Sequence, residues 1–248
     1  MAEDEVTALN LRVEAAWSAA HANNSWDALN AFSLSVAGQS EAVICRDLGT
    51  LDALEKSENI FYVNYHRQVR ASVRDPQDNR WDSIRQQVDA ALFPNYFEDI
   101  FFASLSLNGQ GDENYGLYFL TLKETMVRMR SSVFEENSIL FADRHGLRLT
   151  DPIPPGYRAT WQQRHFLAIS KLHDQVTPSS GAVDFPAILF TPGGGGEAEF
   201  IEIHIHGRLG AASIESVSGA RPSAAEDKVL WRSVQRRLKK LGIAVQER

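Results

Sequence analysis

The sequence predicts an α+β fold, in which strands and helices are mixed without the regular alternation of a doubly wound parallel sheet. Two observations support this prediction. Apolar residues recur at helical spacing near both ends of the chain, and short runs rich in aromatic and β-branched residues lie between them. The 248 residues, 44% of them hydrophobic, are enough to fill a substantial core.

Composition argues against several classes of protein. A formal net charge of -7 offers no broad positive surface for nucleic acid or for an anionic membrane. Apolar runs such as 100–107 and 185–190 are far shorter than the roughly 20 residues that cross a bilayer. The opening MAEDEV lacks the basic and apolar parts of a secretory signal, so we expect a cytoplasmic protein without a membrane partner. Cys45, the single cysteine, is interpreted as a small buried hydrophobe.

The first predicted elements are two helices and a strand. Val6, Leu9 and Val13 begin a helical spacing that extends over residues 5–22. A short strand is predicted over 42–46. Thr50 then stands at the position of an N-cap before a short helix over 51–56.

The remaining elements follow from the same rules. The middle of the chain predicts a strand over 60–66, a helix over 81–92 closed by Pro94, strands over 99–107 and 117–122, and a segment over 126–134 that fits either helix or strand. The break DPIPPG at 151–156 is interpreted as a loop within one domain. The C-terminal part predicts a helix over 160–173, a strand over 185–190, a glycine-rich loop over 193–196, a strand over 199–206 and a helix over 224–241.

The densest group of chemically active side chains lies in the segment FIEIHIHG. If this segment is a strand, its period of two puts Glu202, His204 and His206 on one face and the three isoleucines on the other. The simplest interpretation is an ordinary strand whose polar side faces solvent. Two histidines can also bind one metal ion, so a metal-dependent hydrolase built on His204 and His206 remains an alternative.

Two other motifs have weaker chemical content. Ser131 and Ser132 lack the G-x-S-x-G surroundings of a serine hydrolase. The glycines at 193–196 precede a strand and are not followed by Lys-Ser or Lys-Thr, so they predict a flexible loop bordering a site, not a phosphate-binding loop.

Three segments carry a family resemblance: VNYHRQ (63–68), NYGLYFLTLKETMVRMRSSVFEENS (114–138) and FIEIHIHGRL (200–209). Together they resemble an uncharacterised bacterial domain family that is grouped with ADP-ribosyltransferase toxins. The resemblance implies an ADP-ribosyltransferase-like split β-sheet core with flanking helices, over residues 59–248. Residues 1–58 would then be an added, mostly helical segment.

The resemblance also implies site residues and a substrate, NAD. By position, Glu202 would stabilise the positive charge that develops on the ribose as the bond to nicotinamide breaks. The implied companions are the catalytic candidates Ser131 and Ser132, the acid/base or acceptor-contacting candidate His204, and the NAD-binding candidates Tyr65, His66, Arg67 and Gly116.

Departures from the family pattern leave the acceptor of ADP-ribose unassigned. Phe200 stands where arginine-directed members have a second Glu, Arg67 replaces an expected Pro, and His204 replaces an expected Gln. The resemblance therefore implies either transfer of ADP-ribose to an unidentified acceptor or hydrolysis of NAD. A noncatalytic binding module is, beside the metal-dependent hydrolase, the competing hypothesis.

The last helix has a basic segment over 228–240. Val229, Val234, Leu238 and Leu241 have core spacing, with five Arg and Lys residues mostly elsewhere on the helix. A solvated surface is the favoured interpretation, and a nucleic-acid partner is the less favoured one.

Overall fold

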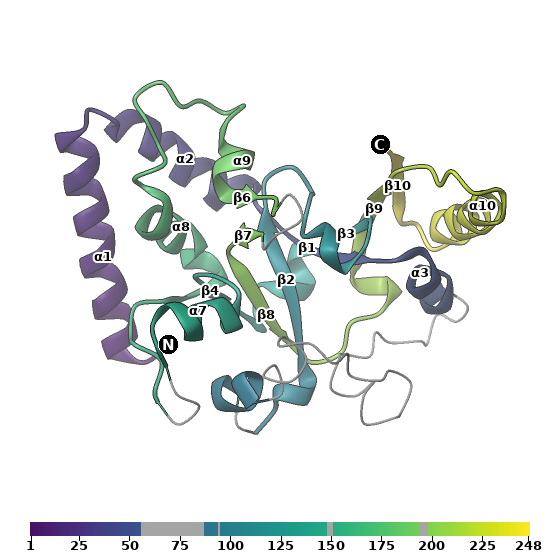
Figure 1. Ribbon diagram of the computed structural model, residues 1–248, viewed down its shortest axis with the longest axis horizontal. Coiled ribbons are helices and arrows are strands. Elements are labelled where there is room, and N and C mark those ends of the chain that lie inside the picture. The colour runs from purple at the N-terminus through teal and green to yellow at the C-terminus, as the bar shows by residue number, and fades with distance from the viewer. Residues whose placement is uncertain (56–86, 94, 148–150, 194–197) are drawn as a thin grey trace.

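The computed structural model describes residues 1–55, 87–93, 95–147, 151–193 and 198–248 (Figure 1). These residues form a mixed α+β fold around a large, mostly antiparallel sheet, which confirms the predicted α+β class. The predicted strand over 60–66, most of the predicted helix over 81–92 and the boundary at residue 58 lie outside the described residues.

The main sheet has eight strands in the order β10-β9-β3-β1-β2-β8-β4-β5. The strands are β1 (Glu41–Arg46), β2 (Ile100–Ser106), β3 (Tyr118–Leu122), β4 (Ser131–Phe134), β5 (Arg158–Thr160), β8 (Glu202–His206), β9 (Ile214–Gly219) and β10 (Ala244–Glu247). Only the β9–β10 pair within this sheet is parallel. A separate two-stranded sheet pairs β6 (Phe190–Thr191) with β7 (Glu199–Phe200).

Helices lie on both faces of the main sheet. They are α1 (Glu3–Ala22), α2 (Trp26–Gln39), α3 (Leu48–Glu55), α6 (Glu124–Val127), α7 (Ser138–Arg144), α8 (Arg164–Leu172), α9 (Phe185–Leu189) and α10 (Ala225–Lys240), and residues 87–92 are also helical. Helices α1, α2 and α8 pack together at one end of the molecule, and α10 packs against α3 and β10 at the other (Figure 1). Among the described helices, none has the length and apolar character needed to span a membrane.

The main core lies on one face of the sheet, beneath α1, α2, α8 and α10, whereas α7 and residues 87–93 pack on the opposite face. It includes Leu9 of α1, Phe32 of α2, Leu167 of α8 and Trp231 of α10, all nearly inaccessible to solvent. Strand β1, from the first part of the chain, lies between β2 and β3 and therefore contributes to the same sheet. Cys45 faces the other side of β1, where it is 5% exposed, which confirms its predicted burial. This burial, with Asp112 nearby, raises the pKa of the Cys45 thiol to about 12.

The predicted strand over 185–190 is wrong, because residues 185–189 form helix α9. Pro186 lies in the first turn of this helix, where its missing N–H does not matter, whereas in a strand it could not donate to the ladder. Phe185 and Leu189, four residues apart, are both buried on one side of the helix. An apolar run of this length does not by itself distinguish a strand from a buried helical turn.

Three further predictions need correction. Helix α3 begins before Thr50, and the Asp47 carboxylate accepts hydrogen bonds from the Thr50 amide (2.7 Å) and hydroxyl (2.8 Å). The predicted strand over 199–206 is divided at Ile201 into β7 and β8, which belong to different sheets. The predicted helix over 160–173 begins only at Arg164, since Thr160 ends strand β5.

In α10, Val229 does not belong to the core and is 66% exposed. Trp231, Val234 and Leu238 form the buried side instead, at spacings of three and four residues. Val229 lies two positions before Trp231 and therefore on a different side of the helix. The segment over 126–134, whose sequence fitted either a helix or a strand, contains the end of helix α6 and the whole of strand β4.

Arg164 links two of the packed helices. Its Nε donates to Ser40 Oγ at 2.8 Å, Nη2 to the Ala37 carbonyl at 2.6 Å and Nη1 to the Trp161 carbonyl at 2.9 Å. Ala37 and Ser40 lie at the C-terminal end of α2, where backbone carbonyls have no partner within the helix. The buried guanidinium of α8 therefore satisfies the end of α2.

We predict that Arg164→Ala lowers the free energy of unfolding by about 2–4 kcal/mol, because it removes three hydrogen bonds and leaves buried acceptors unpaired. Urea denaturation measures the effect. Arg232→Ala, at an exposed position of α10, is the control and should change stability by less than about 0.5 kcal/mol. A loss below about 1 kcal/mol in the Arg164 variant would contradict the proposed link.

Candidate functional site

Strand β8 alternates as the sequence predicts. Ile203 and Ile205 are completely buried in the main core, and Glu202, His204 and His206 lie on the opposite face. The polar side is not an ordinary solvent-facing surface. Glu202 is 4% exposed and His204 1%, and among these three side chains only that of His206 is exposed.

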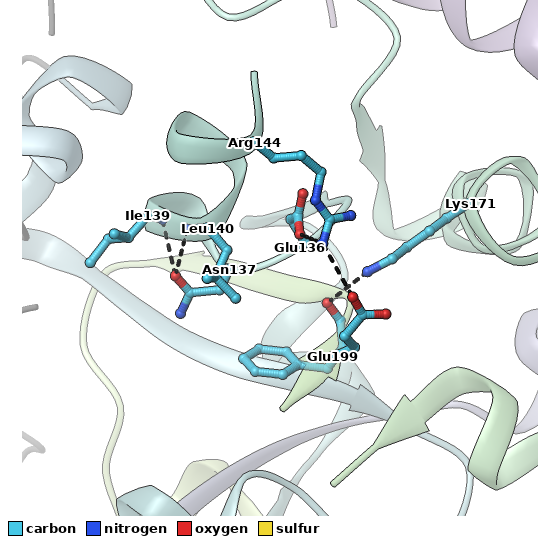
Figure 2. A network of polar contacts seen from close by, with 8 residues as sticks. Glu136, Asn137, Ile139, Leu140, Arg144, Lys171 and Glu199 are labelled. Carbon is cyan, nitrogen blue, oxygen red and sulfur yellow. Dashed lines mark hydrogen bonds and ion pairs between the residues drawn. The ribbon is translucent and has the colours of Figure 1, made fainter. Parts of the chain in front are cut away.

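Two donors fix one oxygen of the Glu202 carboxylate. Oε2 accepts a hydrogen bond from the Ser138 amide at 3.1 Å and contacts His204 Nε2 at 2.9 Å. Ser138 is the first residue of α7, whose N-cap Asn137 accepts from the amides of Ile139 and Leu140 (Figure 2). Asn137 and Glu202 thus share the free amides at the start of α7. Within the described part of the chain, no donor contacts Oε1.

His204 is enclosed by aromatic rings. Its ring centroid lies 4.9 Å from that of Phe93, 5.3 Å from that of Phe102 and 5.5 Å from that of Phe134. Because a carboxylate oxygen is an acceptor, His204 Nε2 must carry the proton of the contact with Glu202. Nδ1 is buried without a hydrogen-bond partner. The surrounding rings therefore hold the imidazole in place, and its Nε2 donates a hydrogen bond to the Glu202 carboxylate.

The two serines lie on opposite faces of β4. Ser132 is the cross-strand partner of His204, so it shares the face of Glu202. Ser131 is the partner of Ile205 and lies on the isoleucine side, where its Oγ is buried without a hydrogen-bond partner. Of this pair, the structure brings only Ser132 to the face that carries the carboxylate.

Gly116 lies apart from Glu202, His204 and Ser132. It precedes β3, which lies three strand positions from β8, a separation of about 14 Å at the usual strand spacing. Its φ of 129° is one that glycine adopts readily, and a Cβ at this position would overlap the Arg46 backbone. The backbone structure therefore explains why a glycine stands here. The other predicted NAD contacts, Tyr65, His66 and Arg67, lie outside the described residues.

A polar network that our sequence analysis did not predict lies beside α7. Arg144 Nη2 contacts Glu136 Oε2 and Glu199 Oε1, both at 3.1 Å, and Lys171 Nζ donates to the Phe200 carbonyl at 3.4 Å (Figure 2). Burial raises the pKa of Glu136, against the opposing effects of Lys171 and Arg144. Burial likewise lowers the pKa of Lys171. The two adjacent glutamates in FEENS are the feature of the sequence that could have indicated this network.

Those predicted site residues that the structure describes do not line a surface depression near α9. This open depression, of about 450 Å³, is lined by residues between 175 and 188, in the segment that follows α8 and in α9, among them Thr177 and Asp184. Nor does the described part of the chain contain a group of three or more His, Cys, Asp or Glu side chains that could hold a metal ion.

No protein-family model matches the chain, and no curated protein matches its sequence. The resemblance to the ADP-ribosyltransferase group therefore depends on the three sequence segments alone.

The network beside α7 generates a prediction about pH. Because the pKa of Glu136 is raised above 4.5 in the folded state, the native protein retains a proton that the unfolded chain has released, and stability falls as pH rises through this interval. Arg144→Gln removes an opposing positive charge, raises this pKa further and deepens the fall. The difference in stability between wild type and variant should therefore grow from pH 4 to pH 7.

Urea denaturation at both pH values measures this difference. We expect about 1 kcal/mol at pH 7, since Arg144 is 53% exposed and solvent screens its charge. Arg232→Gln is the control and should show no pH-dependent difference. An equal loss in the Arg144 variant at pH 4 and pH 7 would assign it to packing and not to the Glu136 charge.

Proposed function

We propose that the chain is an NAD-dependent enzyme of the ADP-ribosyltransferase kind, which transfers ADP-ribose to an unidentified acceptor or hydrolyses NAD. One observation carries the proposal beyond the sequence resemblance. The Glu202 carboxylate has Oε2 fixed by the Ser138 amide and by His204, and no described donor contacts Oε1. The carboxylate is thus held in place with one oxygen left for a ligand.

Such a carboxylate suits the proposed reaction. Breaking the bond between nicotinamide and ribose develops positive charge on the sugar, and a fixed negative charge stabilises that transition state more than the ground state. A carboxylate held in advance by two donors needs little rearrangement as this charge forms. Oε1 of Glu202 would accept a hydrogen bond from a ribose hydroxyl and face the developing cation.

The neighbouring residues take supporting roles in this proposal. His204 was a candidate acid or base, but its ring is fully enclosed and its Nε2 is engaged with Glu202. Its geometry favours positioning of the carboxylate over contact with a substrate. Ser132, opposite His204 on β4, is the serine suited to contact the substrate. NAD binding by His66 or Arg67 stays a prediction.

A noncatalytic binding module is the second candidate, and burial favours it. The side chain of Glu202 is 5% exposed and that of His204 0%. In this alternative the two residues are a buried polar pair that satisfies the face of the sheet, as buried polar groups generally require. The two candidates differ in whether the surrounding side chains admit NAD to Oε1.

We predict that the purified protein releases nicotinamide from NAD and that Glu202→Gln lowers the rate about 100-fold or more, because the amide lacks the negative charge. Nicotinamide release is followed by chromatography. The matched control is Glu215→Gln, which makes the same change at an exposed position of strand β9 and should leave the rate unchanged. Thermal unfolding of each variant shows whether it remains folded.

The two candidates give different results. No release of nicotinamide by the wild-type protein, with or without added acceptor proteins, favours the noncatalytic module. An active protein that keeps its rate in the folded Glu202→Gln variant would show that the carboxylate is not the catalytic one.

A further inference from the structure

Arg158 lies in the same row of side chains as Glu202. On β5 it is the cross-strand partner of Phe134, and Phe134 is in turn the partner of Glu202 on β8. Cross-strand partners point to the same face of a sheet, so the three side chains form a row over three adjacent strands. Two strand spacings separate Arg158 from Glu202 by about 10 Å.

The guanidinium of Arg158 is packed but unsatisfied. Its Cζ lies 5.6 Å from the ring centroids of both Phe93 and Phe134. Nε and Nη2 are buried, and no residue in the described part of the chain accepts a hydrogen bond from them. Leaving such a buried donor unpaired costs about 1–3 kcal/mol, and more for a charged group. Native proteins therefore rarely contain this arrangement without a ligand or an ordered water.

Among the described residues, the acidic side chain that acts on Arg158 is already engaged. Glu5, which acts electrostatically on Arg158, accepts the Gly156 amide at 2.7 Å. A contrast within the same chain shows that the fold can satisfy a buried guanidinium, because each side-chain nitrogen of Arg164 has an acceptor. The open donors of Arg158 thus have no acceptor among the described residues, and a ligand would supply one.

The row approaches the surface near Tyr96. The Phe93 ring, which contacts Arg158, lies 5.7 Å from the ring of Tyr96, and Tyr96 lies 5.4 Å from the ring of His206. Tyr96 is 43% exposed, and His206 is exposed as well. A ligand that approaches Arg158 from this side meets an aromatic and polar surface.

We propose that Arg158 anchors a binding site for a phosphate group on the face of the sheet that carries Glu202. Phosphate oxygens match the forked donors of a guanidinium, and binding in a site of low polarity strengthens such charge-assisted hydrogen bonds. Since Nε and Nη2 are covered, the phosphate reaches them through a shift of surrounding side chains. The origin of the phosphate rests on the proposed function: in NAD it is the pyrophosphate, bound at a residue whose backbone lies about 10 Å from that of Glu202.

Calorimetric titration at constant ionic strength tests the site, with inorganic pyrophosphate and NAD as separate probes. We expect the wild-type protein to bind pyrophosphate and Arg158→Met to bind it at least tenfold more weakly. Arg232→Met, which makes the same change at an exposed position of α10, is the control and should bind like wild type. Equal binding by the wild-type and Arg158→Met proteins, or no binding by the wild-type protein, would overturn the proposal.

Folding of the variants is measured first by thermal unfolding. Arg158→Met should be at least as stable as wild type, because it replaces an unpaired buried charge with an apolar side chain of similar size. If it fails to fold, Arg158→Lys keeps the charge without the forked donors and should also bind at least tenfold more weakly. A crystal structure of the wild-type protein with pyrophosphate decides independently of both variants: phosphate at Nε and Nη2 supports the site, and water there or phosphate elsewhere overturns it.

The probes separate this proposal from the proposed function. Pyrophosphate binding that depends on Arg158, in a protein that releases no nicotinamide, retains the phosphate site and removes the NAD chemistry. Nicotinamide release that persists unchanged in Arg158→Met, in a protein that does not bind pyrophosphate, retains the enzyme and removes the site. Tenfold weaker binding of both probes by this variant, but not by Arg232→Met, assigns the phosphate to the dinucleotide.

Discussion

The alternation of side chains along β8 is the constraint on which the candidate site depends. Ile203 and Ile205 are completely buried on the face that forms the main core, so Glu202 and His204 must lie on the other. β8 is an interior strand between β2 and β4, so these polar side chains cannot reach solvent around an edge of the sheet. They satisfy one another instead, with help from the first amide of α7.

The polar groups that the fold leaves open are as informative as those it satisfies. Arg164 makes a full set of hydrogen bonds and joins α8 to the end of α2, which gives it a structural role. Arg158, at the start of β5, has two buried nitrogens without acceptors. Glu202 is intermediate, with one oxygen held by two donors and the other without a described donor. The open groups of Arg158 and Glu202 share one face of the sheet. A ligand that supplied hydrogen-bond partners to both would gain the most binding free energy there.

Sequence reasoning succeeded where one local pattern was strong. The amphipathic spacing over 5–22 and the alternation around His204 both correspond to real elements. It failed over 185–190, where a short apolar run fits two structures, and it missed β9 and β10, whose sequences IESVSG and AVQE contain no run of aromatic or β-branched residues. Val229 shows a third kind of failure, since an apolar residue close to the correct spacing is exposed.

The sequence by itself determined which side chains share a face, because the periods of strands and helices are set by the geometry of the local backbone. It placed Glu202 and His204 together in this way. Only the tertiary structure decided that β4 lies beside β8, that Ser132 and not Ser131 joins them, and that α7 supplies an amide. The same pairing put Arg158 in the row of Glu202. Contacts between segments distant in the chain depend on how the whole core packs, and no local period encodes them.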